Sequence, residues 1–333
     1  MSELRHNLLT QDWILFAPER SRRGELRPHV ARPRPAAHVA DCPFCPGNEE
    51  RSAGAVLEMA GDGGWTLRVV PNKFPALEPS GGTAGPGSEP FPRRPAFGYH
   101  EVLVESHRHD DVLALMDDDG VARVLAAYRS RYQALRADPR VHHVVVFKNH
   151  GADAGCSQEH PHSQIVAMSV VPPEVRHRLA IVEDYRARHG ECLSCHLLAE
   201  EVAAAERVVL ADEHFVAYVP FAAYSPFHTW IVPRAHQASF GDLSDEALAA
   251  LARTLRALLH KVHVALGDPD YNLVLRSAPG DARAAASWHW YASLVPRVSK
   301  QAGFELGSGM FINTMLPESA ARLLRDAPLS GDQ

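Results

Sequence analysis

Apolar residues recur along the chain in two patterns: short stretches that predict strands, and longer stretches at helical spacing. Residues 99–105 alternate between apolar and polar, and residues 142–147 are rich in β-branched side chains, as is typical of strands. A turn followed by a short strand is predicted within residues 9–18, and further strands at residues 65–70, 208–210, 215–219, 229–232 and 271–275. We also expect a strand to open near residue 287 and another at residue 160.

Three long helices are predicted between these strands. Residues 119–137 place Val121, Val124, Leu125 and Tyr128 on one helical face. Residues 173–189 are typical of a connecting helix, and residues 244–266 begin with Ser244, a residue preferred at the N-cap. The long stretch 79–95 is rich in Gly, Pro and Ser and is expected to form a surface loop.

The order of these features occurs twice along the chain. Each half runs through a Cys-x-x-Cys pair, strands, a histidine, a long helix, a strand and a final strand that a histidine opens. The interval from His109 to His160 nearly equals the interval from His236 to His289. We therefore predict an internal duplication, with an N-terminal half at 1–172 and a C-terminal half at 173–333.

Composition narrows the class of protein. The chain has 333 residues, 46% of them hydrophobic and 22% charged, which is typical of a soluble globular protein. A net charge of −6 argues against a nucleic-acid partner. No apolar run approaches the roughly 20 residues of a membrane span, and the N-terminus lacks the pattern of a signal peptide. We expect a cytoplasmic protein with no membrane partner.

The stretch KNHGADAGCSQEHPHSQIV, residues 148–166, is the strongest chemical signal. A glycine loop of this kind turns backbone N–H groups toward an anion. If a strand begins at His160, then His160, His162 and Gln164 form one row on one face of the sheet. A single histidine is more often structural, and the chain has 20, but this combination points to phosphoryl or nucleotidyl chemistry.

Four of the five cysteines form two Cys-x-x-Cys pairs, and the fifth, Cys156, lies in the glycine loop. Disulfides are unlikely in the cytoplasm, and the turn-forming residues around Cys42 suit a zinc knuckle better than a redox motif. Two closed structural Zn²⁺ sites are predicted, because each half supplies two thiols and two imidazoles. Their ligands are Cys42, Cys45, His109 and His160 in one half and Cys192, Cys195, His236 and His289 in the other. The alternative is unligated buried thiols.

The two halves differ in chemistry, because Tyr291 occupies the position that corresponds to His162. Only the first half therefore keeps a candidate nucleophile. Near the N-terminus, Arg20, Arg22 and Arg23 are arranged to grip a phosphate. A solvated run of charges is an equally good interpretation of these arginines.

At this point the chain resembles the galactose-1-phosphate uridylyltransferase family, a branch of the histidine-triad superfamily with a duplicated domain. The most specific part of the resemblance is Gly155-Cys156-Ser157 followed by the pentad His160-Pro161-His162-Ser163-Gln164. Further matching stretches are residues 9–13, 42–45, 71–75 and 303–309. The second Cys-x-x-Cys pair is similar to the two-zinc branch, which includes ADP-glucose phosphorylases. The resemblance implies an α+β fold with two histidine-triad-like halves, each an antiparallel sheet packed against a long helix.

The resemblance also implies a ping-pong reaction. His162 attacks the α-phosphorus of UDP-glucose, and the UMP then passes to galactose 1-phosphate, with Gln164 and Ser157 as hydrogen-bond donors to the phosphates. A backbone carbonyl at His160 accepts from the other ring nitrogen of His162. Substrate binding is assigned to Asn72, Asn149, Arg20, Arg23, Gly155 and Phe304. The family suggests a homodimer whose small-molecule partners are a nucleotide sugar and a hexose 1-phosphate.

Departures from the family leave alternatives open. Gln164 stands where histidine-triad hydrolases have a third histidine, which favours transfer over hydrolysis. The segment 307–309 lacks hexose-contacting residues, and Tyr291 and Ser293 replace ligands of an iron-type site, so no such site is expected. One alternative is an ADP-glucose phosphorylase with the same covalent chemistry. The other is an inactive, zinc-stabilised module that binds nucleotides.

Overall fold

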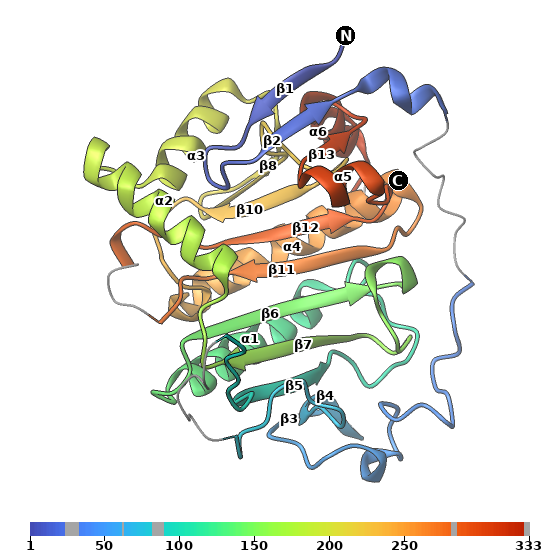
Figure 1. Cartoon of the computed structure of the whole chain (residues 1–333). Helices are drawn as coiled ribbons and strands as arrows, with labels where there is room; N and C mark the ends of the chain where they lie inside the picture. Colours follow the sequence, from blue (N-terminus) through green and yellow to red (C-terminus); the bar gives the residue numbers. More distant parts are fainter. Residues whose placement is uncertain (24–32, 62, 82–89, 281–284, 330–333) are drawn as a thin grey trace.

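A ten-stranded antiparallel sheet runs through the whole molecule in the computed structural model (Figure 1). The structure describes every residue except 24–32, 62, 82–89, 281–284 and 330–333, and it does not describe the side chains of residues 21–23. The strand order is β3-β4-β5-β7-β6-β11-β12-β10-β9-β8. In chain order the strands are β3 (Leu57–Gly61), β4 (Gly64–Pro71), β5 (Gly98–Val104), β6 (His143–His150), β7 (His162–Met168), β8 (Val208–Ala211), β9 (Phe215–Tyr218), β10 (Thr229–Pro233), β11 (Tyr271–Arg276) and β12 (Tyr291–Pro296).

The sheet consists of two five-stranded halves joined edge to edge. The order β3-β4-β5-β7-β6 in the first half corresponds to β8-β9-β10-β12-β11 in the second. The central strands β6 and β11 pair in register, from Tyr271 opposite His150 to Leu275 opposite Val146. This arrangement confirms the predicted α+β fold and its duplication, whereas the proposed division at residue 172 stays a prediction.

Two long helices lie behind the sheet in Figure 1, α1 (Asp118–Arg136) and α4 (Asp245–Leu266). Ser244 caps α4 as the sequence predicts, since its side chain accepts from the amide of Ala247. The side chain of Asp117 likewise accepts from the amide of Gly120. The apolar faces of both helices and of α6 (Pro317–Asp326) pack with the sheet into one hydrophobic core.

The opposite face of the sheet is covered over the second half. The helices α2 (Pro173–His189) and α3 (Leu193–Ala204) pack on it in a second core that includes Val182, Leu193 and Tyr291. A small sheet of β1 (Glu3–His6), β2 (Trp13–Phe16) and β13 (Phe311–Asn313) lies above the same half (Figure 1). These elements bury the face of β12 that corresponds to the face of β7 carrying His162.

The start of β7 corrects one prediction. The strand begins at His162, so His162 and Gln164 share a face, but His160 precedes the strand and does not belong to the row. The second half behaves alike, since β12 begins at Tyr291 and follows His289. In both halves the histidine before the strand is turned to a pair of cysteines, which prevents it from continuing the pleat.

Several short elements were not predicted from the sequence. These are β1, β3, β13, α3, α6, the 3-10 helices η1 (Pro18–Arg23), η2 (Glu49–Arg51), η3 (Ala152–Ala154) and η4 (Phe240–Asp242), and α5 (Gly303–Ser308). The two Cys-x-x-Cys pairs also differ locally, because the first lies in a turn and the second opens α3. Among the described helices none is long and apolar enough to cross a membrane.

Candidate active site

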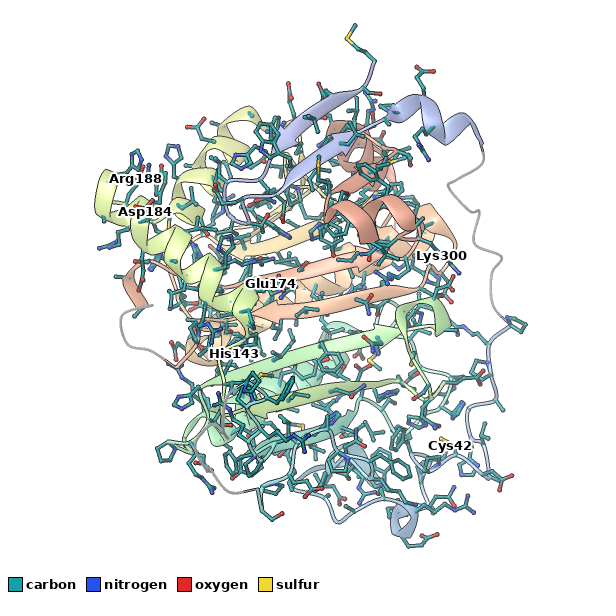
Figure 2. All side chains as sticks on the ribbon, viewed as in Figure 1. Cys42, His143, Glu174, Asp184, Arg188 and Lys300 are labelled. Atoms are coloured by element: carbon teal, nitrogen blue, oxygen red, sulfur yellow. The ribbon has the colours of Figure 1, made fainter. Side chains whose placement is uncertain are left out.

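The first Cys/His cluster lies at the end of the sheet where β6 ends and β7 begins; Figure 2 labels Cys42 there. The Cys45 Sγ is 3.5 Å from the His109 Nδ1 and 3.6 Å from the His160 Nδ1. The His160 Nε2 donates to the carbonyl of Ser106 at 2.8 Å, which leaves Nδ1 for a metal. Burial lowers the pKa of His160 to about 4, so the imidazole is neutral at pH 7, as a ligand must be.

Backbone amides stabilise the sulfurs of this cluster. The amide of Val39 donates to the Cys45 Sγ and the amide of Phe44 donates to the Cys42 Sγ. All four ligand residues are buried, and their ligand atoms lie within 4.8 Å of one another. Two thiols and two imidazoles in this arrangement fit a tetrahedral metal ion.

The second predicted cluster is also assembled. The Cys195 Sγ is 3.3 Å from the Nδ1 atoms of both His236 and His289, and Cys192 completes the group. The His236 Nε2 lies 3.0 Å from the carbonyl of Ala285, so Nδ1 again faces the sulfurs. Each half can therefore hold one metal ion with its own four ligands.

His162 lines a cleft of about 910 Å³ beside the first cluster. Its Nδ1 is 2.9 Å from the carbonyl of His160, so this nitrogen carries the proton and Nε2 is the unprotonated one. Burial lowers the pKa of His162, which favours the neutral ring. The Phe44 ring packs 5.6 Å from the His162 ring, between centroids. The site thus presents a neutral imidazole, the form that acts as a nucleophile.

A buried polar network lies at the start of β7, where His162 and Ser163 stand. The Lys148 Nζ donates to Glu105 at 2.7 Å and to the carbonyl of His162 at 3.3 Å. The Ser163 hydroxyl donates to the other oxygen of Glu105 and accepts from Tyr128. The side chains of Lys148 and Glu105 are 2% and 0% exposed. The sequence analysis missed this pair, although a lysine within an apolar strand is a signal of buried pairing.

The glycine loop forms the upper wall of the cleft. Gly151 and Gly155 adopt φ values of 83° and 85°, which favour glycine, on either side of η3. Asn149, Cys156 and Ser157 line the cleft next to it.

Asn149 is held by the second half of the chain. Its side-chain oxygen accepts from the Asn272 Nδ2 at 2.8 Å, so its amide nitrogen is the end left for a ligand. Asn272, another residue that the sequence analysis missed, therefore orients a cleft residue from across the central strand pair.

Neither Gln164 nor Asn72 is among the residues that line the cleft. Gln164 is half-buried and its Oε1 is 2.8 Å from the His100 Nε2. The Asn72 Nδ2 is 3.1 Å from the same ring nitrogen. The structure thus brings these two predicted residues together through a histidine that the sequence analysis did not select.

Comparison with known proteins agrees with this geometry. The family model described as galactose-1-phosphate uridyl transferase, N-terminal domain, matches residues 1–172, and the corresponding C-terminal domain matches residues 178–330. The chain belongs to the galactose-1-phosphate uridylyltransferase family. Membership supports the coarse prediction that it is a nucleotidyltransferase.

Over nearly its whole length the chain is similar to family members with two different activities. An ADP-glucose phosphorylase from Arabidopsis thaliana is 34% identical, with 98% of this chain and 93% of that protein covered. A galactose-1-phosphate uridylyltransferase from Rattus norvegicus is 30% identical, with 98% and 87% covered. The crystal structure of an Arabidopsis thaliana ADP-glucose phosphorylase with bound ADP-glucose matches with a TM-score of 0.84 at 33% identity, covering 99% of this chain and 100% of that one. A uridylyltransferase structure matches with a TM-score of 0.76 at 28% identity, with 98% of each chain covered.

Two predicted substrate residues, Arg20 and Phe304, do not line the cleft. Arg20 is exposed on η1 and does not line it, and the side chain of Arg23 lies outside the described residues. Phe304 is 43% exposed on α5, which contacts β13 of the small sheet. Their roles stay predictions, as does the role of Gly155, which neighbours Asn149.

The position equivalent to His162 is filled differently in the second half. The Tyr291 hydroxyl accepts from the Arg178 Nη1 at 2.5 Å, beneath α2. The Ser293 hydroxyl lies 2.9 Å from the His228 Nε2. Neither residue offers a neutral imidazole to a cleft, in agreement with the predicted difference between the halves.

Proposed function

We propose that the protein transfers a nucleotide from a nucleotide sugar to a phosphate-bearing acceptor through a covalent nucleotidyl-His162. The observation that carries the proposal is the neutral His162 ring, whose Nδ1 is tied to the His160 carbonyl and whose Nε2 is unprotonated in a cleft of about 910 Å³. A cleft of this volume is in the range that binds a small-molecule ligand.

The reaction has two displacements. The His162 Nε2 forms a bond to the α-phosphorus, the bond from that phosphorus to the bridging oxygen breaks, and hexose 1-phosphate leaves with the electron pair. A phosphate oxygen of the acceptor then attacks the same phosphorus, and the bond to His162 breaks. The His160 carbonyl holds the proton on Nδ1, and it stabilises the positive charge that the ring carries in the intermediate.

In this proposal three polar groups stabilise the phosphates. The Asn149 amide nitrogen and the Ser157 hydroxyl belong to residues of the cleft wall. Gln164 stands two residues after His162 on the same strand face, about 7 Å along the strand. Each of these residues supplies a hydrogen-bond donor for a non-bridging or leaving oxygen, where negative charge develops.

Zinc in both Cys/His clusters belongs to the same proposal. Two thiols and two imidazoles form a closed tetrahedral set, so the metal would be structural. In the first half the ligands include His160, whose carbonyl orients the nucleophile. In the second half the ligands fix the segment that leads into β12.

Two substrate pairs fit this chemistry. The first, expected from the family, is UDP-glucose with galactose 1-phosphate as the acceptor. The second is ADP-glucose with inorganic phosphate, and the higher identity and TM-score of the Arabidopsis thaliana ADP-glucose phosphorylase favour it. Both pairs use the same intermediate and differ in the base and the acceptor.

Intact mass spectrometry after incubation with one nucleotide sugar and no acceptor tests the proposal. We expect a mass gain of one UMP from UDP-glucose or one AMP from ADP-glucose, and loss of the adduct when the matching acceptor is added. His162→Ala should give no adduct while keeping its metal content. Tyr291→Phe, the matched change in the second half, should still be labelled. Labelling of His162→Ala would overturn the proposed role of this residue.

A further inference from the structure

The ring of His100 connects three elements beside the proposed nucleophile. Its Nδ1 accepts from the backbone amide of Ala76 at 3.1 Å, and its Nε2 is 2.8 Å from the Gln164 Oε1. His100 lies on β5, which pairs with β7, and it is diagonal to Gln164 because Gln164 pairs with Val102.

The amide of Ala76 fixes the state of this ring. An N–H group only donates, so the His100 Nδ1 that receives it is unprotonated and the proton of the neutral ring is on Nε2. Two groups lie within reach of this Nε2–H group, the Asn72 Nδ2 at 3.1 Å and the Gln164 amide at 2.8 Å. The Asn72 Nδ2 is itself a donor and cannot accept from it, so the Nε2–H group donates to the amide oxygen of Gln164. The side-chain amide of Gln164 is thereby oriented, with its NH₂ group as the end left for a ligand.

We infer that His100 is a positioning residue that holds Gln164 as a hydrogen-bond donor toward the transferred phosphoryl group. The inference rests on the proposed nucleotidyl transfer. An amide that turned over would present its oxygen, which repels a phosphate oxygen, instead of its NH₂ group. His100 thus decides whether Gln164 stabilises or opposes the negative charge that develops in the displacement.

The second half contains the same pair in a different state. His228, which directly precedes β10, corresponds to His100 on β5, since Trp230 pairs with Ser293 as Val102 pairs with Gln164. The Trp230 Nε1 donates to the His228 Nε2 at 2.9 Å, so that nitrogen is an acceptor. In the half without a nucleophile, the histidine is therefore not arranged as a donor to the β12 side chain.

Two variants of nearly equal shape separate positioning from packing. His100→Gln offers an NH₂ group near the place of Nε2, whereas His100→Glu offers only acceptor oxygens there. We expect His100→Glu to slow labelling of His162 about a hundredfold, with the concentration of nucleotide sugar at half-maximal rate changed much less. His100→Gln should recover most of the rate, and His228→Gln, the matched change in the second half, should label like wild type.

The measurement is the single-turnover rate of adduct formation, with UDP-glucose and ADP-glucose in separate reactions. In a Gln164→Ala background, His100→Glu should cause no further loss, because the group it positions is gone. Equal rates for His100→Gln and His100→Glu, or losses that multiply in the double variant, would overturn the inference.

A readout without turnover separates this inference from the proposed function. Long-range ¹H–¹⁵N spectra should show His100 as a neutral ring protonated at Nε2, with a shift of this nitrogen on Gln164→Ala. A wild-type protein that forms no adduct with either nucleotide sugar contradicts the proposed function. A His100 ring protonated at Nδ1 contradicts the positioning role, whatever the activity.

Discussion

At the residue scale, His160 joins the first Cys/His cluster to the proposed nucleophile His162 through two of its own groups. Its ring Nδ1 faces Cys42 and Cys45, and its carbonyl accepts from His162. The ring of a neighbouring residue, Phe44, packs against the ring of His162. Any change in the position of the cluster is therefore passed to the nucleophile by one hydrogen bond and one ring contact.

The buried Lys148–Glu105 pair gives a prediction about stability. Lys148→Met leaves a carboxylate buried without its cation, and we expect the free energy of unfolding to fall by about 3–5 kcal/mol. The double variant Lys148→Met/Glu105→Gln removes both charges and should be more stable than the single variant. Urea denaturation of both proteins measures this. A double variant as unstable as the sum of the two single variants contradicts it.

His228 gives a prediction about pH. Burial lowers the pKa of His228 to about 3, so the folded protein binds its proton less well than the unfolded chain, whose pKa is near 6.5. The stability that this neutral ring provides is present above pH 6.5 and is lost as the pH falls toward 3, by about 1.4 kcal/mol per pH unit. The variant His228→Gln has no titrating ring at this position and therefore lacks this pH-dependent contribution to the free energy of unfolding.

The free energy of unfolding of wild type and His228→Gln should therefore be compared from pH 7 to pH 4. We expect the difference between the two proteins to shift against wild type as the solution becomes more acidic. Other titrating groups, the metal ligands included, are shared by both proteins and cancel in this difference. A pH-independent difference contradicts the assignment of a buried neutral ring.

At the element scale, the two Cys-x-x-Cys segments have different tasks. The first is a turn that carries Phe44 to the nucleophile, and the second opens α3, which packs on the covered face of the second half. Loss of the first metal should therefore affect chemistry, and loss of the second should affect stability alone.

The matched variants Cys45→Ser and Cys195→Ser test this difference. Each should lose about one metal ion per chain by elemental analysis. We expect Cys45→Ser to slow adduct formation roughly 10- to 100-fold, whereas Cys195→Ser should melt at a lower temperature with a labelling rate near that of wild type. A Cys195→Ser protein that labels as slowly as Cys45→Ser contradicts this division.

Local patterns predicted the elements that depend on local rules. The helices α1, α2 and α4 were predicted to within a residue or so, because their apolar spacing and caps are local. The eight residues of the two Cys/His clusters were also predicted, since Cys and His recur at matched intervals in a duplicated chain. The sequence analysis missed contacts that depend on register between distant strands. The pairing of β5 with β7 alone brings His100 to Gln164, 64 residues further along the chain.

At the scale of the whole molecule, both halves build the cleft. Asn272 orients Asn149, and the carboxylate of Asp270 accepts from the amide of Asp153 in the glycine loop. Asp268, also from the second half, lines the same cleft. Asn149 and the glycine loop are therefore held by contacts that the first half alone does not contain.

This arrangement predicts that residues 1–172, expressed alone, do not form the nucleotidyl-His162 adduct. The fragment keeps His162, Gln164 and Ser157, but it exposes β6 as an unpaired edge and lacks Asn272. We expect it to self-associate, because an exposed edge strand pairs with other chains. Intact mass and gel filtration of the fragment, with the full chain as the control, measure both effects. A monomeric fragment labelled at the rate of the full chain contradicts the prediction.

The pairing of β6 with β11 has a consequence for how such a protein can evolve. Two separate five-stranded sheets would have four unpaired edge strands. In the described residues the joined sheet has two, β3 and β8. The second half thus pairs with β6, the edge strand of the first half that lies at the centre of the joined sheet. Residues of the second half at positions equivalent to the active site can change, as Tyr291 illustrates, whereas β11 must keep its pairing with β6. Selection then acts on the second copy as a scaffold, and sequence change in it should be restrained most strongly along that shared seam.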